Sequence, residues 1–399
     1  MSHLMKTYSP QAVAFERGEG VWLYDTNGKK YLDALAGIAV NGLGHAHPGL
    51  VKAISAQAAK IIHTSNLFIV PQQETLAAKL CELSGMEQAF FCSSGAEANE
   101  AAIKVARLYG HKRGVELPTI IVMEKAWHGR TIATLSATGS RKAQAGFEPL
   151  VAGFVRVPYN DVAAIENVAQ NNQNVVAVLV EMIQGEGGVR VADAEFQRKL
   201  QTLCNAKEWL YMVDEVQTGI ARTGKWFAYQ HAGVQPDVLS LAKGLGSGIP
   251  IGACLGARRA KDVFQPGNHG TTFGGGPLAC VAAMTTLQAI ADEGLMENAA
   301  KVGTHLKARL QTELKGVAGV ADVRGMGMML GVELDRPCGA MVKRALEVGL
   351  VTNVTQDNVI RLLPALIMKQ SEADMLIDKL VPLIKQFLSE PQVALAKQA

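Results

Sequence analysis

The chain has 399 residues, of which 48% are hydrophobic and 19% charged, a composition typical of a soluble globular protein with two or three domains. The net charge of +3 is too small to indicate binding to nucleic acid or to a membrane, and no stretch approaches the roughly 18 apolar residues of a membrane span. Six scattered cysteines without a CxxC pair predict reduced thiols, and the first ten residues lack the apolar core of a signal peptide. We therefore expect a cytoplasmic protein.

The first 50 residues are rich in turns. Asn27-Gly28 stands between two β-rich runs in VWLYDTNGKKYLDAL, a pattern that predicts a hairpin. His45 and His47 follow in the turn GHAHPG, but no further ligand lies close in sequence, so we expect no metal site there. We expect residues 1–50 to pack beside a smaller domain formed by the carboxyl end of the chain.

Residues 51–283 alternate short apolar runs with helix-length segments. This alternation predicts a large α/β domain, with a mostly parallel sheet covered by helices and with ligands at the carboxyl ends of the strands. The predicted strands are Gln88–Ser94, Thr119–Lys125, Val175–Met182, Leu210–Val216, Asp237–Lys243 and Ile251–Ala257. Residues 284–399 predict a smaller α+β domain, and we expect its last ten residues to fray.

A helix is predicted to begin directly after the first of these strands. Ser94 and Glu97 have the spacing of a capping box, in which each side chain bonds a backbone N–H at the helix start. The N–H groups of Gly95 and Ala96 would then be free to bind a phosphate, which the helix dipole also favours. The alternative is an ordinary capped helix without a ligand.

The sequence WHGRT follows the second predicted strand. Trp127 at a strand end can stack on a flat heterocycle, and Arg130 can hold a carboxylate through two hydrogen bonds. A core tryptophan and a surface arginine are the alternative. Farther along, Glu186 lies among glycines in QGEGG and could pair with Arg361, unless the segment is only a flexible surface turn.

Two charged residues end neighbouring predicted strands of the core. Asp214 ends the run WLYMVD, and Lys243 ends DVLSLAK before the chain breaks into glycines. A lysine that can form a Schiff base and an acid that can hold a pyridinium nitrogen protonated indicate a site for pyridoxal phosphate. The alternative is a surface lysine and a helix-capping acid.

Two glycine-containing loops complete the pattern. Thr271 and Thr272 in GTTFGGG could add a phosphate donor, or the segment could be a simple linker. The segment GIARTGK fits most of a phosphate-binding P-loop, but Trp226 stands where a Ser or Thr should bind magnesium, which disfavours an ATPase. No GxGxxG motif follows a first strand, which disfavours a nicotinamide enzyme.

Together, SSGAEANEAAIKVAR, WHGRT, EMIQGEGGV, VDEVQTGIARTG, LAKGLGSGIPIGA and GTTFGGGPLAC resemble the class III, fold-type I pyridoxal-phosphate aminotransferases, over about Tyr8 to Leu388. The resemblance implies that Lys243 forms the Schiff base and moves a proton, that Asp214 binds the pyridinium nitrogen, and that Gln217 faces the phenolate oxygen of the cofactor. The cofactor-binding residues that it implies are Ser94, Gly95, Ala96, Trp127, Asp214, Glu215, Val216, Gln217, Lys243 and Thr272.

The same resemblance implies how the substrates bind. Arg361 would bind the α-carboxylate of glutamate and 2-oxoglutarate, and Glu186 would pair with Arg361 while the ω-amino donor is bound. Arg130 and Thr271 would bind the far carboxylate of that donor. The family donates Thr272 from the neighbouring subunit, which implies a homodimer with shared active sites. Trp127 departs from the phenylalanine that the family usually has.

The expected reaction is transfer of the ω-amino group of N2-acetyl-L-ornithine to 2-oxoglutarate, in arginine biosynthesis. The segments YLDALAGIAVNGLGHAHPGLVKAI and HTSNLF carry the resemblance to enzymes of acylated ornithine, and we expect Val40, Asn41 and Asn66 near the acyl group. Succinylornithine, ornithine or 4-aminobutyrate are alternative donors. A pyridoxal-dependent aminomutase, or a nucleotide-binding protein without catalytic activity, are alternatives of another kind.

Overall fold

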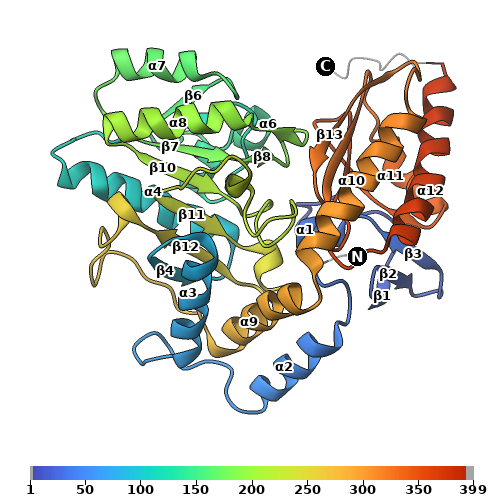
Figure 1. Ribbon diagram of the computed structural model, residues 1–399, viewed down its shortest axis with the longest axis horizontal. Helices are drawn as coiled ribbons and strands as arrows, with labels where there is room; N and C mark the ends of the chain where they lie inside the picture. Colours follow the sequence, from blue (N-terminus) through green and yellow to red (C-terminus); the bar gives the residue numbers. More distant parts are fainter. Residues whose placement is uncertain (1–2, 392–399) are drawn as a thin grey trace.

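The computed structural model describes residues 3–391 and contains a large central sheet with helices around it (Figure 1). The sheet has seven strands, in the order β4-β12-β11-β10-β7-β5-β6. Their bounds are β4 Gln88–Cys92, β5 Thr119–Met123, β6 Phe154–Val157, β7 Val175–Glu181, β10 Leu210–Asp214, β11 Val238–Leu241 and β12 Gly252–Gly256. Among them, β12 alone runs antiparallel to its neighbours, so the predicted mostly parallel α/β sheet is confirmed.

The strands are buried on both faces because helices pack on both. Along β5, Ile120 faces the core cluster that contains α4 (Gly95–Lys112), whereas Ile121 faces the cluster that contains α7 (Val162–Asn171) and α8 (Ala194–Lys207). This explains why the inner strands β5, β7, β10 and β11 are buried at every position, without the alternation of a half-exposed sheet.

The carboxyl ends of the parallel strands bring the predicted residues to one edge of the sheet. Asp214, the last residue of β10, is in register with Glu181, the last residue of β7. β11 ends at Leu241, two residues earlier than predicted, and Lys243 begins a short 3-10 turn, Lys243–Leu245. The acid and the lysine therefore leave neighbouring strands at the same end.

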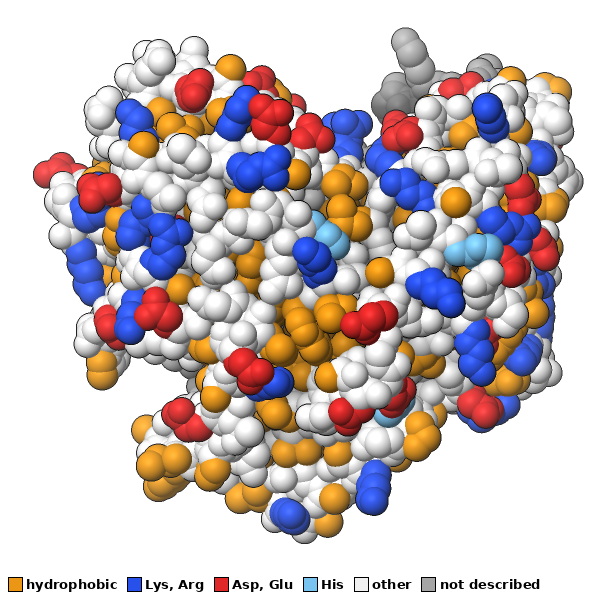
Figure 2. Space-filling view, viewed as in Figure 1, with side chains coloured by type: hydrophobic (Ala, Val, Ile, Leu, Met, Phe, Trp, Pro, Cys, Tyr) orange, Lys and Arg blue, Asp and Glu red, His pale blue; other side chains and the backbone are white. Residues whose placement is uncertain are grey.

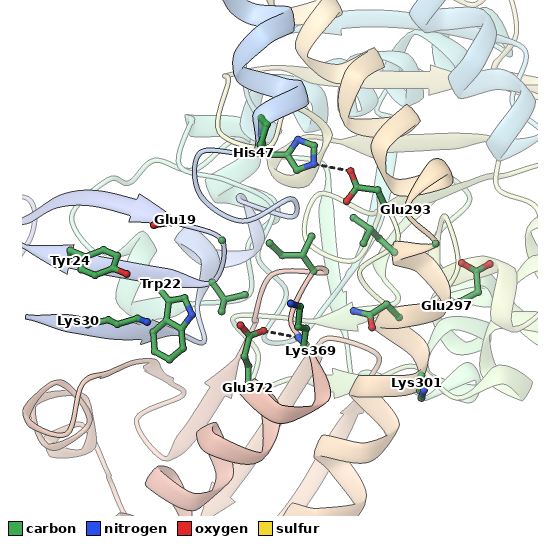
Figure 3. A pocket seen from close by; sticks show the side chains of 17 residues that line it. Glu19, Trp22, Tyr24, Lys30, His47, Glu293, Glu297, Lys301, Lys369 and Glu372 are labelled. Atoms are coloured by element: carbon green, nitrogen blue, oxygen red, sulfur yellow. Dashed lines mark hydrogen bonds and ion pairs between the residues drawn. The ribbon is translucent and has the colours of Figure 1, made fainter.

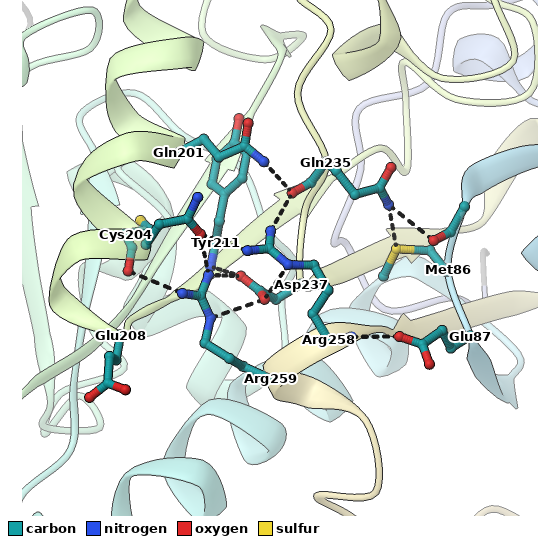
Figure 4. Close-up of polar contacts among 12 residues, drawn as sticks. Met86, Glu87, Gln201, Cys204, Glu208, Tyr211, Gln235, Asp237, Arg258 and Arg259 are labelled. Atoms are coloured by element: carbon teal, nitrogen blue, oxygen red, sulfur yellow. Dashed lines mark hydrogen bonds and ion pairs between the residues drawn. The ribbon is translucent and has the colours of Figure 1, made fainter.

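The end of β11 far from this edge is fixed by a buried charge. Asp237 is completely buried, and Arg259 donates hydrogen bonds to both of its carboxylate oxygens, at 3.1 and 2.7 Å (Figure 4). The N–H of Tyr211 also donates to Asp237, at 2.9 Å. This arrangement ties the start of β11 to β10, since a buried carboxylate is stable only when it is paired and hydrogen-bonded.

The remaining strands form smaller sheets. The predicted hairpin at Asn27-Gly28 is confirmed by antiparallel pairing of β2 and β3, and β3 pairs in parallel with β15 near the other end of the chain. A separate antiparallel sheet has the order β13-β14-β17-β16. The strands are β1 Phe15–Glu19, β2 Trp22–Asp25, β3 Lys30–Asp33, β8 Ile183–Gln184, β9 Arg190–Val191, β13 Val320–Met326, β14 Met329–Leu334, β15 Leu350–Val351, β16 Asn353–Thr355 and β17 Val359–Leu362.

The helices not yet given join and cover these sheets. They are α1 Ala36–Ala39, α2 Pro48–Ala58, α3 Pro71–Ser84, α5 Ile132–Ala137, α6 Arg141–Gln144, α9 Pro277–Asp292, α10 Leu295–Glu313, α11 Ala340–Glu347 and α12 Gln370–Ser389. The strands β1–β3 and the segment from α10 to α12 lie together at one side of the large sheet (Figure 1). The domain boundaries near residues 50 and 283 stay predictions.

At the carboxyl end, Arg344 still donates two hydrogen bonds to Glu390, each of 2.7 Å, so the chain is held at this residue. The expectation that the tail frays concerns mainly residues 392–399, which lie outside the described residues. Within residues 3–391, no helix has both the length and the apolar character needed to cross a membrane.

Candidate active site

A cavity of about 600 Å³ lies at the carboxyl ends of the strands. It contains Lys243 and Asp214 together with residues from the start of α4 and from the loop after β5. The lining residues that matter for its chemistry are Ser94, Gly95, Ala96, Asn99, Trp127, His128, Arg130, Glu181, Asp214, Val216, Gln217 and Lys243. The structure thus brings together most of the residues that the sequence singled out.

Lys243 is a half-buried residue of the cavity wall. Among the described residues, no hydrogen bond or ion pair involves its Nζ atom. Burial lowers the pKa of Lys243, and the nearby positive charge of Arg361 lowers it further. Its backbone is also strained, with φ of 41° in the left-handed region that non-glycine residues avoid. A lysine with a lowered pKa is a better nucleophile and base near neutral pH.

Asp214 has many hydrogen-bond donors but no lysine or arginine partner within residues 3–391. Its Oδ1 accepts from the N–H of Val216 at 2.9 Å. Its Oδ2 lies 2.7 Å from Nδ2 of Asn99 and 2.8 Å from Nδ1 of His128. Asn99 and His128 are nearly completely buried, so they fix the direction of the carboxylate.

Asn99 and His128 were not predicted as site residues. Asn99 lies in the second turn of α4, and its Nδ2 also donates to the carbonyl of His128. Each keeps a buried polar atom without a partner among the described residues, Oδ1 of Asn99 and Nε2 of His128. A buried asparagine among the alanines of a helix is the sequence signal that could have identified the first of them.

The start of α4 forms one wall of the cavity. Ser94 caps the helix, because its Oγ accepts from the N–H of Glu97 at 3.2 Å, as predicted. The carboxylate of Glu97 accepts from the hydroxyl of Ser94 and from the N–H of Ser93. A capping box would have used the N–H of Ser94 in place of that of Ser93. The first backbone bond of the helix runs from Ala98 to Ser94, and the N–H groups of Gly95 and Ala96 precede it.

Gly95 packs against Val216, the residue two positions after Asp214. A Cβ atom at Gly95 would lie 2.6 Å from Cγ1 of Val216, closer than two carbon atoms can approach. The helix start can therefore lie this close to the end of β10 only because residue 95 is glycine.

Trp127 and Arg130 lie on the opposite loop, after β5. The N–H of Trp127 donates to Glu181 at 3.0 Å. The guanidinium carbon of Arg130 lies 4.6 Å from the centre of the Trp127 ring, and Arg130 is otherwise exposed at the mouth of the cavity. The aromatic ring is thus placed for stacking, and the arginine is held over it by a cation–π contact.

Arg361 and Glu186 form the ion pair that the sequence suggested, with 2.5 Å between Nη1 and Oε1. Arg361 is completely buried, and its Nη1 also donates to Gln217 on the cavity wall at 3.2 Å. The carbonyl of Glu186 accepts from the hydroxyl of Thr355 and the amide of Gln356. The segment QGEGG is therefore anchored and mostly buried, and the alternative of a flexible surface turn is wrong.

Five of the predicted site residues do not line this cavity: the ion pair of Glu186 and Arg361 lies behind its wall, and Glu215, Thr271 and Thr272 lie elsewhere. The carboxylate of Glu215 points elsewhere and accepts from the hydroxyl of Thr218 at 2.6 Å and the N–H of Tyr229 at 2.9 Å. Thr271 and Thr272 lie in the loop before α9, at the surface.

That loop is attached to the segment between α2 and α3. Nδ2 of Asn66 donates to the carbonyls of Thr271 and Gly274, so Asn66 holds the loop and does not line the cavity. Val40 does line it. Around the attachment the surface is apolar: the large exposed side chains are Ile61, Ile62, Leu67, Phe68, Ile69 and Phe273. Hydrophobic atoms gather at this lower edge of the molecule (Figure 2).

The cavity wall at Val40 follows a strained turn. Ala36, Gly37, Ile38 and Ala39 all have positive φ values, between 48° and 66°, so α1 is a left-handed turn. Asp33 holds its start, because its Oδ1 accepts from the N–H groups of Leu35 and Ala36. Strain of this kind persists where the surroundings fix the backbone, often next to a functional site.

A larger cavity, of about 1030 Å³, lies elsewhere, between the β2–β3 hairpin and the start of α10 (Figure 3). Nε2 of His47 lies 2.9 Å from Glu293 at its edge, and Lys30 lies over the ring of Trp22. Its acidic and basic side chains are intermixed, and it contains neither Lys243 nor Asp214. We therefore place the candidate active site in the smaller cavity.

The residues of the smaller cavity fit a pyridoxal phosphate cofactor. Asp214 is a buried carboxylate without a permanent cation, which suits a protonated pyridine nitrogen. Lys243 is a half-buried lysine whose amine has a lowered pKa and no hydrogen-bond partner in residues 3–391, which suits reaction with an aldehyde. Gly95 and Ala96 offer N–H groups at a helix start, which suit a phosphate.

Comparison with known proteins gives one consistent family. The model of the class-III aminotransferases matches residues 4–384. An acetylornithine aminotransferase of Bordetella bronchiseptica is 58% identical over 391 residues, which are 98% of this chain and 100% of that protein. An acetylornithine aminotransferase of Nitrosomonas europaea is 56% identical over 97% of this chain and 99% of its own length.

Solved structures of aminotransferases have the same fold as this chain. The ornithine aminotransferase of Toxoplasma gondii ME49 is similar with a TM-score of 0.93 and 33% identity, covering 98% of this chain and 94% of that one. The acetylornithine aminotransferase of Elizabethkingia anophelis has a TM-score of 0.86 and 36% identity, covering 96% and 97%. Another structure of the Toxoplasma gondii enzyme is described as having partial occupancy of PLP at its active site. The predicted fold-type I architecture is confirmed by these similarities.

Proposed function

Because this chain belongs to the class-III aminotransferase family, we propose that it transfers the ω-amino group of N2-acetyl-L-ornithine to 2-oxoglutarate, giving N-acetylglutamate 5-semialdehyde and glutamate in arginine biosynthesis. One observation carries the proposal: a partnerless lysine and a buried carboxylate share a cavity whose wall contacts an arginine neutralised by a glutamate. The acetylornithine aminotransferases at 56–58% identity support the choice of donor.

Pyridoxal phosphate supplies an aldehyde that takes up the amino group and a ring that accepts an electron pair during proton removal. The N–H groups of Gly95 and Ala96 would bind its phosphate, and Trp127 and Val216 would contact its ring. Asp214, fixed by Asn99 and His128, would bind the pyridine N–H. These assignments rest on the positions of the residues around one cavity.

Lys243 performs the proton transfer. Its amine, with its lowered pKa, would take the proton from the substrate carbon that bears the amino group and would deliver a proton to the bound cofactor. In the second half of the cycle the same amine moves the proton in reverse, while 2-oxoglutarate becomes glutamate.

Glu186 and Arg361 distinguish the two substrates. The reacting carbon of the ω-amino donor carries no carboxylate, so Glu186 stays paired with Arg361 and leaves no unpaired buried cation. When 2-oxoglutarate binds, its α-carboxylate takes the place of Glu186 on Arg361. Arg130 at the cavity mouth binds the far carboxylate of the donor, and Thr271, which does not line the cavity of its own chain, would join it from the partner chain.

The enzyme is a homodimer in this proposal, and Thr272 of each chain completes the phosphate site of the other. The apolar surface around Leu67, Phe68, Ile69 and Phe273 supports this, because it adjoins the loop that carries Thr272. Phe68 and Phe273 are each 69% exposed, which is unusual for phenylalanine outside an interface. A cytoplasmic location stays a prediction.

The donor is tested with the purified enzyme saturated with pyridoxal phosphate. N-acetylornithine, succinylornithine, ornithine and 4-aminobutyrate are each added without 2-oxoglutarate, and the loss of visible cofactor absorbance is followed by stopped flow. We expect the highest kcat/KM with N-acetylornithine and recovery of the absorbance when 2-oxoglutarate is added. A preference for another donor contradicts the substrate, and turnover that never needs 2-oxoglutarate indicates an aminomutase.

The shared site is tested by mixing two inactive variants. Lys243→Ala and Thr272→Ala chains are unfolded, mixed and refolded together. If Thr272 serves the partner, a mixed dimer has one intact site and one site that lacks both residues, so activity returns. Without any recovery above either variant alone, Thr272 acts within its own chain or not at all.

A further inference from the structure

Glu181 is a buried carboxyl group for which the proposed mechanism has no role. It ends β7, lies in register with Asp214 on the neighbouring parallel strand, and lines the active-site cavity. Residues in register on adjacent strands point to the same face and lie within about 5 Å of one another. Two carboxyl groups are therefore held side by side in a place that water barely reaches, because both are at most 5% exposed.

Two buried carboxyl groups on neighbouring strands disfavour each other's charge, which favours the neutral form of one of them. The hydrogen bonds show which one keeps its charge. Asp214 accepts from the N–H of Val216 and the amide of Asn99, and its Oδ2 also lies 2.8 Å from Nδ1 of His128, which donates when it carries the proton. Glu181 accepts one hydrogen bond, from the N–H of Trp127 to its Oε2, and its other carboxyl oxygen has no partner among the described residues.

We propose that Glu181 carries a proton in the working enzyme, so that Asp214 holds the only negative charge of the pair and Glu181 presents a neutral hydroxyl to the cavity. Burial, followed by the charge of Asp214, raises the pKa of Glu181 well above its ordinary value, which agrees with this assignment. The location of the proton does not depend on the proposed function. Only its effect on proton transfer by Lys243 rests on that function.

The neutral state matters for Lys243. An ionised Glu181 would add to the negative charges of Glu186 and Asp214 near the amine, and negative charges favour the protonated form of lysine. A protonated amine cannot accept the proton from the substrate. Glu181 is thus a positioning residue: through its neutral carboxyl it holds the N–H of Trp127, and it leaves Lys243 with a lowered pKa.

The groups that act on Glu181 come from several elements packed around it. Asp214 approaches from β10 and Glu186 from the loop after β8, and both raise its pKa. Lys243 approaches from the turn after β11 and lowers it, as does the N–H of Trp127 after β5. The hydroxyl of Tyr159 donates to the backbone carbonyl of Glu181, so it does not compensate a charge on the carboxyl group.

Infrared spectroscopy tests the location of the proton without any enzymatic assay. Spectra of the wild-type holoenzyme and of Glu181→Gln are compared at about pH 8, where Glu215, whose pKa burial raises to about 7, is mostly ionised. We expect the stretching band of one protonated carboxyl group in the wild type, its loss in Glu181→Gln, and its retention in the control Glu215→Gln.

Two results would overturn the proposal. The wild type could lack a protonated band at this pH, or the band could persist in Glu181→Gln and disappear in Asp214→Asn, which would put the proton on Asp214. The amide that Glu181→Gln introduces keeps an oxygen for the N–H of Trp127, so this variant is expected to fold. If it does not fold, Glu181→Met, which is similar in size and also lacks the carboxyl group, gives the same comparison.

A second measurement tests how Glu181 affects the protonation of Lys243. The pH titration of the visible absorbance of the bound cofactor reports the protonation of its bond to the lysine. If Glu181 is already neutral, Glu181→Gln should move the midpoint by less than about half a pH unit. A decrease of more than about one unit would mean that a negative charge had been removed, and hence that Glu181 is ionised. The infrared result stands even if the substrate proposal fails.

Discussion

Arg361 joins two parts of the active site through one nitrogen atom, since its Nη1 donates to Glu186 at 2.5 Å and to Gln217 at 3.2 Å. Gln217 lines the cavity. Glu186 belongs to a loop after β8, and its own backbone carbonyl accepts hydrogen bonds from Thr355 and Gln356. The guanidinium is completely buried, so its charge needs a negative partner in every state of the enzyme. This requirement makes the Glu186 side chain an internal competitor of any substrate carboxylate.

Glu186→Gln removes this competitor. We expect the variant to bind 2-oxoglutarate and glutamate more tightly and to lose preference for the ω-amino donor. A tenfold fall in the ratio of kcat/KM for N-acetylornithine to that for glutamate corresponds to about 1.4 kcal/mol, a reasonable size for one charged contact. Half-reaction kinetics with each donor give the ratio, and Glu186→Asp is the control that keeps the charge. An unchanged ratio in Glu186→Gln would exclude the competition.

Trp127→Phe tests the contact between Trp127 and Arg130. Phenylalanine keeps an aromatic face for the cofactor but attracts a cation less strongly than tryptophan does. Because an exposed cation–π contact contributes about 0.5–1 kcal/mol, KM for N-acetylornithine should rise about two- to fivefold while kcat changes less. Steady-state kinetics over a range of donor concentrations separate the two constants. Equal KM values for the two proteins would show that Trp127 does not position Arg130.

Glu215 predicts a pH dependence of stability. Burial raises its pKa from 4.5 to about 7, so between these values the folded protein binds a proton that the unfolded chain has lost. The stabilisation is therefore full below about pH 4.5 and is lost as the pH rises through 7, by about 3 kcal/mol in total. Urea unfolding of the wild type and Glu215→Gln at about pH 5 and pH 8 measures it. The wild type should lose more stability than the variant over this range, and parallel losses would contradict the assignment.

Gly95→Ala tests the close approach of α4 to the end of β10. The added Cβ would lie 2.6 Å from Cγ1 of Val216, so Val216 or the helix start must move at the place proposed for the phosphate. We expect the affinity for pyridoxal phosphate to fall at least about tenfold, or about 1.4 kcal/mol. Adding Val216→Ala removes the clashing atoms and should restore part of the affinity. Fluorescence titration of the cofactor-free proteins compares all four combinations, and an additive effect of the two substitutions would argue against the clash.

The sequence predicted the large sheet well because its strands are continuously apolar and are separated by long helices. Val175–Glu181 is buried at every position, and periodicity suffices for such a strand. The edge strand β6, Phe154–Val157, was missed, since it has four residues and its arginine interrupts the apolar run. Predicted strand ends were up to two residues too long, as at Lys243, because propensity does not mark where pairing stops.

The site was predictable only where a residue lies at the end of a strand or in a glycine loop. Asp214 and Lys243 have that signature, whereas Asn99 and His128 act on Asp214 from 115 and 86 positions away, a distance that no local pattern reveals. Glu215 shows the opposite error: it follows Asp214 directly, but the turn after β10 directs its carboxylate toward Thr218 and Tyr229. Side-chain direction after a strand depends on the turn, and the turn is a tertiary property.

The pairing of β3 with β15 has a consequence for folding during translation. β3 leaves the ribosome near the start of synthesis, but its parallel neighbour follows only when most of the chain has been made. The edge of β3 that pairs with β15 therefore stays unpaired until β15 is made. By then all strands of the large sheet, which lie between β3 and β15 in the sequence, have been synthesised. Since an unpaired edge invites association with other chains, the early hairpin is the segment of this enzyme most in need of protection during translation.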